Sequence, residues 1–224
     1  MSQILKLVMA GLLINLILSL INQYFQNLGF ITSRTHPVVS DIRAVQEYSS
    51  YIKIFVGTVV LTPIFEELSF RYLLNFQQKA FKIGLSACLT MSIIVLGELN
   101  TLPVFEYIPS VLRFRFLLMF ILIFAPTFVV VSFTENKLSL SQWLNNNLLR
   151  RYGMILFCNV MFATMHLYVV SSTDNAWFYI TILSPYFFTG LIFTYARLKY
   201  GFVASVLTHA IFNLFLVSLN ILLR

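Results

Sequence analysis

Charged residues are scarce in this sequence. Only 10% of its 224 residues are Asp, Glu, Lys or Arg, whereas a soluble domain carries about 25%. So few charges cannot cover a water-exposed surface, and 59% of the residues are hydrophobic. The composition therefore excludes a soluble globular protein and indicates an integral membrane protein.

Cysteine and acidic residues are also few. The two cysteines, Cys88 and Cys158, lie in apolar runs without a C-x-x-C pattern, so we expect inert packing thiols. Fifteen basic residues against eight acidic ones give a net charge of +7. Because most basic residues flank apolar runs, this charge indicates membrane orientation and contact with the lipid bilayer, and no nucleic-acid partner is expected. The chain has no Gly-rich phosphate loop and no internal repeat.

Apolar runs recur along the whole chain and predict its architecture. In a bilayer the backbone must satisfy its hydrogen bonds within each element, and no run alternates like a barrel strand. The sequence therefore predicts an all-α, polytopic transmembrane helix bundle with about seven membrane helices. The seven runs are 4–21, one starting near 51, 83–97, 116–133, 154–170, 176–196 and 202–223.

Two parts of the chain are distinguished. Residues 1–50 are predicted to form a first transmembrane helix, without a cleavage site after it, and a polar connector. Residues 51–224 are predicted to form the core, with a two-helix insert at about 83–133. The run that starts near 51 is expected to continue as one helix to about Lys82, with a kink at Pro63.

The polar segment 134–151, which contains Trp143, is expected to lie at the membrane interface as an amphipathic helix. Orientation follows from the basic residues on each side of the predicted topology. The side of the N-terminus holds eight Lys and Arg residues with Glu135 as its only acid, whereas the opposite side holds six with five acids. The positive-inside rule then predicts a cytoplasmic N-terminus and, with seven crossings, a C-terminus outside.

Ionisable and amide side chains far from the ends of apolar runs are the candidate functional residues, because burying them in hydrocarbon is costly. Spacing places Glu67 and Arg71 on one helix face, where they can pair, and rotates Glu66 by about 100°. The candidates are Glu66, Glu67, Arg71, His166, His209 and Asn213.

These residue types favour hydrolysis of an amide. Two adjacent carboxylates, one of them neutralised by Arg71, form a general-base arrangement. A histidine nearby can share the attacking water. His209 and Asn213 lie four residues apart on one helix face, and their N–H groups can stabilise an oxyanion. Phe162, one turn before His166, is expected to pack against its imidazole.

Three short motifs carry a resemblance to a known family. Residues 66–71 have the pattern EExxxR, residues 162–166 the pattern FxxxH and residues 209–213 the pattern HxxxN. In this order, on membrane helices, they resemble the motifs of the CPBP family of CAAX prenyl protease 2-like intramembrane proteases. That family includes bacteriocin-processing and immunity relatives. The resemblance covers about residues 51–223.

The resemblance implies a helical bundle with an intramembrane polar cavity, in which Glu66 activates a water that His166 shares. It implies His209 and Asn213 as the oxyanion site. Supporting roles are implied for Glu67, Arg71 and Phe162. The chain would then be an intramembrane endopeptidase that hydrolyses a peptide or membrane-protein substrate in a bacterial cell membrane. No pattern in the sequence indicates an oligomeric state.

Glu66 and His166, in the first two motifs, are 100 residues apart, more than the single helical hairpin usual in the family. Sixteen residues from Glu66 to the predicted helix end near Lys82 span about 24 Å, and fifteen from Arg151 to His166 span about 22 Å. With two intervening crossings, Glu66 and His166 are predicted at nearly equal depth.

Other readings of the same residues stay open. The chain could be a non-catalytic immunity or chaperone-like protein that retains the fold, or a proton-coupled transporter. No cofactor is expected, although a zinc-dependent protease is an alternative. Its ligands would be Glu66, His166 and His209, with Glu67 as a further candidate. Against zinc, the chain has no HExxH motif, and Arg71 would bring a positive charge next to the ion.

Overall fold

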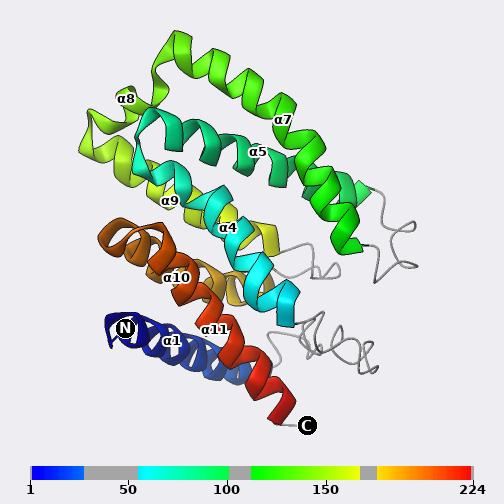
Figure 1. The fold of residues 1–224 in the computed structure, drawn as a ribbon. Helices are drawn as coiled ribbons and strands as arrows, with labels where there is room; N and C mark the ends of the chain where they lie inside the picture. The colour runs from blue at the N-terminus through cyan, green and yellow to red at the C-terminus, as the bar shows by residue number, and fades with distance from the viewer. Residues whose placement is uncertain (1, 28–54, 101–111, 167–175, 223–224) are drawn as a thin grey trace. The chain divides into compact units, whose positions relative to one another are not determined.

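The computed structural model describes residues 2–27, 55–100, 112–166 and 176–222, and every element in these ranges is a helix (Figure 1). This confirms the all-α prediction. The chain divides into two compact units, one of Met1–Ile64 with Phe162–Arg224 and the other of Phe65–Met161. The elements are α1 (Ser2–Asn27), the π-helix η1 (Phe55–Leu61), α4 (Thr62–Phe70), the 3-10 helix η2 (Tyr72–Asn75), α5 (Gln78–Asn100), α7 (Leu112–Leu138), α8 (Leu140–Asn145), α9 (Leu148–Thr164), α10 (Ala176–Tyr200) and α11 (Phe202–Leu222).

Three segments of the described part of the chain are long and apolar enough to cross a membrane. They are Ser2–Ile21 of α1, Phe120–Leu138 of α7 and Phe202–Leu219 of α11. The number of seven crossings and the polar cavity stay predictions. Helix α1 extends to Asn27 and so includes the first residues of the predicted polar connector, whose remainder lies outside the described residues.

In the first unit, α11 packs against α1, α10 and η1, and α1 also packs against α10 (Figure 1). Asn15 of α1 donates a hydrogen bond to the Thr189 hydroxyl of α10 at 3.2 Å. A single residue, Gly201, joins α10 to α11 with φ of +93°, a conformation that glycine adopts without strain. Arg197 and Lys199 lie in the last turn of α10, where positive charge is favourable.

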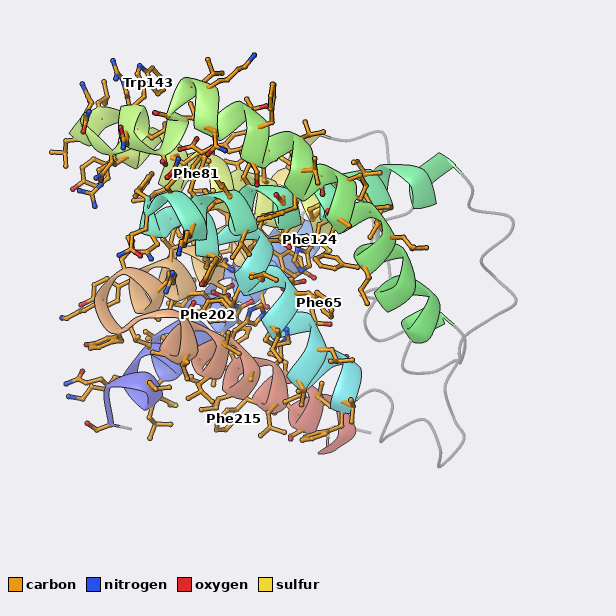
Figure 2. All side chains as sticks on the ribbon, turned by 45° about the horizontal axis from the view of Figure 1, so that its top comes forward. Phe65, Phe81, Phe124, Trp143, Phe202 and Phe215 are labelled. Atoms are coloured by element: carbon orange, nitrogen blue, oxygen red, sulfur yellow. The ribbon has the colours of Figure 1, made fainter. Side chains whose placement is uncertain are left out.

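In the second unit, α5 packs against α7, η2 and α8. Its core is formed by Ala87, Ile94 and Phe120, against which α4 and α7 pack partly buried residues. Phe65 of α4 and Phe124 of α7, both labelled in Figure 2, are two of these. Phe65 meets the ring of Phe120 edge to face, with centroids 4.8 Å apart. The two cysteines are buried in this unit as free thiols, as predicted.

The helix predicted to continue to Lys82 ends earlier, so that prediction is wrong. Helix α4 stops at Phe70, and after η2 the chain passes through Phe76 in a left-handed conformation with φ of 53°. Lys82 therefore belongs to the next helix, α5, which also contains the run 83–97. Glu66 lies four residues from its helix end, about 6 Å instead of 24 Å. The length of α4 therefore does not place Glu66 at the depth of His166.

Close packing stabilises this turn. A Cβ atom on Gly84 of α5 would lie 2.3 Å from the backbone nitrogen of Leu73 in η2. Only glycine allows α5 to approach η2 so closely. The segment 71–77 itself contains neither glycine nor proline, and Asn75 alone is a weak signal for a turn.

The single interfacial helix predicted for 134–151 is also wrong. Helix α7 continues to Leu138, Ser139 takes a left-handed conformation, and the six-residue α8 precedes α9. The N-cap residue Ser139 makes no side-chain hydrogen bond to α8. The carboxylate of buried Glu135 caps the helix instead, because it accepts hydrogen bonds from the Ser141 backbone at 3.1 Å and from the Ser141 hydroxyl. Trp143 is half exposed, with the Arg150 guanidinium 4.0 Å from its ring centroid.

Candidate active site

The first motif lies where α4 ends. Arg71 follows the helix directly, and its guanidinium donates to the Glu67 carboxylate at 2.7 Å. The Arg71 backbone N–H also donates to the Glu67 carbonyl at 3.0 Å. Both side chains are almost completely buried. The ion pair expected from the i,i+4 spacing is therefore present, and it joins the last turn of α4 to the start of the following turn.

The two adjacent glutamates differ in their surroundings. Phe65 and Leu68 turn one face of α4 to the apolar core, and Glu67 is completely buried with Arg71. Glu66 is only half-buried. Successive residues on a helix point about 100° apart, so one carboxylate is held in an ion pair while its neighbour keeps access to the surroundings of the helix.

The second motif lies at the end of a helix and not in its interior as predicted. His166 was predicted far from helix ends, but α9 ends at Thr164 and His166 forms part of a following 3-10 turn. This is a correction. Residues 167–170 of the predicted run lie outside the described residues. The last carbonyl groups of a helix lack partners within it, and the Nδ1 atom of His166 lies 2.8 Å from the carbonyl oxygen of Phe162, one of these groups.

That contact determines the protonation pattern of the ring. A carbonyl oxygen only accepts hydrogen bonds, so Nδ1 of His166 donates. In the neutral imidazole, Nε2 then carries the lone pair and is the nitrogen able to accept a proton. His166 thus combines two functions: it caps α9 with one nitrogen and presents a basic nitrogen with the other.

An aromatic cluster brings His166 and His209 together within the first unit. The Phe162 ring meets both imidazoles edge to face, with centroid distances of 5.0 Å to His166 and 6.0 Å to His209. This confirms the predicted packing of Phe162 against His166. Helix α10 supplies a further ring for each imidazole: Tyr186 stacks on His166 at 3.9 Å, and Phe193 stacks on His209 at 4.2 Å.

The stacking follows from helix geometry. Tyr186 and Phe193 are seven residues apart, close to two turns, so they share one face of α10. Ser205 of α11 also donates to the Phe193 carbonyl at 2.8 Å. Imidazole forms its hydrogen bonds in the plane of the ring, and the stacked rings fix the orientation of that plane. The cluster therefore restricts the directions in which the histidines can act.

The third motif is on α11, where His209 and Asn213 lie one turn apart. His209 is buried, and Asn213 is half-buried. The Asn213 amide donates to the backbone carbonyl of Thr58 in η1 at 2.9 Å. This contact joins two segments that are 155 residues apart in sequence. The amide predicted for the oxyanion site is therefore directed, through this N–H, at a backbone oxygen.

The motif residues are divided between the two compact units. Glu66, Glu67 and Arg71 belong to the second unit, whereas Phe162, His166, His209 and Asn213 belong to the first. Within either unit, the described residues contain no group of three His, Cys, Asp or Glu side chains gathered as metal ligands. Glu67 is moreover held by Arg71 at 2.7 Å, which makes it a poor ligand for a cation.

Several residues of the site carry no sequence motif. Tyr186 and Phe193 are two of many aromatic residues in an apolar run, and nothing in the sequence marks them as partners of the histidines. Thr58 is equally inconspicuous. A signal did exist in Pro63, because a proline removes a backbone N–H donor and so leaves a nearby carbonyl in need of another one.

The sequence profile of the Rce1-like family, described as type II CAAX prenyl endopeptidase Rce1-like, matches residues 48–215. The match covers about three quarters of the chain and includes all three motifs. No curated protein and no solved structure matches the chain.

Proposed function

Because this chain belongs to the Rce1-like family of type II CAAX prenyl endopeptidases, we propose that it is an intramembrane endopeptidase. Its apolar helices and its family together make it a membrane protein. The substrate is a peptide or a membrane protein, and the reaction is hydrolysis of one peptide bond. The family name also makes a prenylated C-terminal peptide a substrate to be tested.

In the proposed mechanism, the Glu66 carboxylate removes a proton from water, and the water oxygen attacks the scissile carbonyl carbon. His166 accepts a hydrogen bond from the same water through Nε2. The N–H of His209 stabilises the oxyanion of the tetrahedral intermediate. Glu66 then returns the proton to the departing amine, so that the carboxylate is regenerated as the peptide bond breaks.

The contrast between the two adjacent glutamates carries this assignment. Glu67 is completely buried and paired with Arg71, so it is suited to a supporting role, whereas Glu66 is only half-buried. A general base must reach its substrate and must exchange its proton during turnover. Phe162 supports the histidines through its contacts with both rings.

Replacement of Glu66 by glutamine tests the proposal, because it keeps the size of the side chain but removes the base. Turnover of a fluorogenic peptide by the purified, reconstituted protein should fall by about 10²–10⁴-fold. The thermal unfolding midpoint should stay close to that of the unaltered protein. Full activity of Glu66→Gln would show that another group activates the water, and His166→Ala, measured alongside, would show whether the histidine does so.

We further propose that the enzyme works without a metal ion. Glu67, a candidate ligand, already binds the Arg71 guanidinium, and catalytic zinc sites usually combine their ligands on a short motif such as HExxH. Turnover should therefore persist after exhaustive chelation, with metal content measured in parallel. If activity disappears with a chelator and returns with stoichiometric zinc, the zinc-dependent mechanism is correct.

We propose a bacterial cell membrane as the location, with the N-terminus in the cytoplasm. The uneven distribution of basic residues supports this orientation. Single cysteines introduced at Ser139 and Asp174 in a cysteine-free background should be labelled from opposite sides of the membrane. Labelling of both from the same side would contradict this topology, in which a membrane helix separates the two residues.

A further inference from the structure

The backbone carbonyl of Thr58 occupies a special position in its helix. In a π-helix such as η1, carbonyl i accepts a hydrogen bond from the N–H of residue i+5. For Thr58 that residue is Pro63, the second residue of α4, and proline has no N–H. The π-helical register therefore leaves the Thr58 carbonyl without a donor from its own segment.

Asn213 supplies a donor at this point. Its side-chain amide lies 2.9 Å from the Thr58 oxygen, and α11 packs against η1 over this region. Thr58, Pro63 and Asn213 all belong to the same compact unit. A polar backbone group that is removed from water and left unpaired is costly. A donor from a neighbouring helix therefore stabilises the π-helical hydrogen-bond pattern, in which Pro63 provides no N–H.

We propose that Asn213 is a positioning residue whose amide replaces the N–H that Pro63 lacks and thereby fixes the change from π-helix to α-helix. Helix α4 starts at this change, and Glu66 lies three residues after Pro63. A register change of one residue rotates all following side chains by about 100°. The hydrogen bond to Thr58 therefore controls the direction in which the Glu66 carboxylate points.

This role differs in a measurable way from direct stabilisation of an oxyanion. An oxyanion donor contributes equally whatever residue stands at position 63. A replacement for a missing N–H is needed only while position 63 is proline. Alanine at position 63 restores the N–H, so the importance of Asn213 should depend on the residue at that position.

The experiment is a double-mutant cycle of Pro63→Ala and Asn213→Ala, with thermal unfolding and peptide turnover measured for all four proteins. With proline at position 63, Asn213→Ala should lower the unfolding midpoint and reduce kcat about tenfold, the loss expected for one hydrogen bond to a backbone acceptor. With alanine at position 63, the same change should alter kcat by about twofold or less. Asn15→Ala is the matched control, because Asn15 donates to Gly11 and Thr189, and its effect should be equal in both backgrounds.

Equal effects of Asn213→Ala in both backgrounds would overturn the proposal. A loss of turnover in both backgrounds without any change in the unfolding midpoint would instead establish Asn213 as an oxyanion donor. If Asn213→Ala does not fold, Asn213→Ser provides the same cycle with a smaller perturbation. The turnover readout rests on the proposed protease function, but the unfolding midpoints do not. If the protein showed no peptidase activity, the proposed function would be disproved, and the unfolding midpoints of the four proteins would still test the hydrogen bond.

Discussion

The two regions that carry the motifs are held together by different forces. At the end of α4, two opposite charges four residues apart form a buried ion pair within one short stretch of chain. Around the histidines, neutral rings and amides from distant segments contact one another: Phe162, Tyr186 and Phe193 surround the imidazoles. The charged region is thus organised locally, and the neutral region is organised by packing between helices.

This difference has an energetic consequence. Removing one partner of a buried ion pair leaves a charge without compensation, which costs several kcal/mol. Removing one ring from an aromatic cluster forfeits a smaller contact energy, because no charge is exposed to an apolar environment. We therefore expect the stability of the two regions to respond very differently to single substitutions.

Arg71→Ala should have the largest effect on stability, because it removes the positive charge that compensates the buried Glu67 carboxylate. The free energy of unfolding should fall by about 3–5 kcal/mol, measured by chemical denaturation in detergent. Arg150→Ala is a control for loss of an arginine at a more exposed position, where it contacts Trp143, and should cost about 1 kcal/mol or less.

The double variant Glu67→Leu with Arg71→Met sharpens this test. It replaces the pair by apolar side chains of similar length, and such replacements are often close to neutral. It should recover most of the stability lost in Arg71→Ala. An Arg71→Ala protein as stable as the unaltered one would show that the ion pair contributes nothing to the charged region.

Gly84→Ala should have the next largest effect, because the new Cβ would lie 2.3 Å from the Leu73 backbone. Crowding of this kind typically costs about 1–3 kcal/mol, and here it would displace the turn that follows Arg71. Gly153→Ala is the matched control: no atom lies within 4 Å of the added Cβ, and alanine favours a helix. Equal unfolding midpoints for the two variants would contradict the close approach of α5 to η2.

Tyr186→Leu should have the smallest effect on stability, about 0.5–1.5 kcal/mol, through loss of the stack on His166. Tyr186→Phe keeps the ring and should restore both the unfolding midpoint and kcat. The two substitutions separate stacking from any contribution of the hydroxyl group. If Tyr186→Phe were as impaired as Tyr186→Leu, the hydroxyl rather than the ring face would position His166.

The helical content of the chain could be predicted well, because apolar runs of sufficient length in a membrane protein form helices. The Glu67–Arg71 pair could also be predicted, since residues four apart on a helix are neighbours regardless of tertiary structure. The turn after Arg71 could not. It depends on Phe76 in a left-handed conformation and on the contact of Gly84 with Leu73, and neither is visible in the local sequence pattern.

The histidine region shows the same limit. Periodicity placed His209 and Asn213 on one face of α11, but their partners are Phe193 and Thr58, which only tertiary packing can supply. His166 was expected in the middle of a helix because the apolar run continues to residue 170. Hydrophobicity marks the length of an apolar segment, whereas the end of α9 is set by where its backbone hydrogen bonds stop.

The one-residue connection at Gly201 also bears on how this protein is made. In the predicted topology both α10 and α11 cross the membrane, and the single glycine between them leaves no loop that would let them insert independently. We therefore expect α10 and α11 to enter the bilayer as one hairpin, with Arg197 and Lys199 beside the bend holding that end on the cytoplasmic side. We expect a lengthened linker at Gly201 to reduce the fraction of correctly inserted protein, because each helix could then orient independently during synthesis.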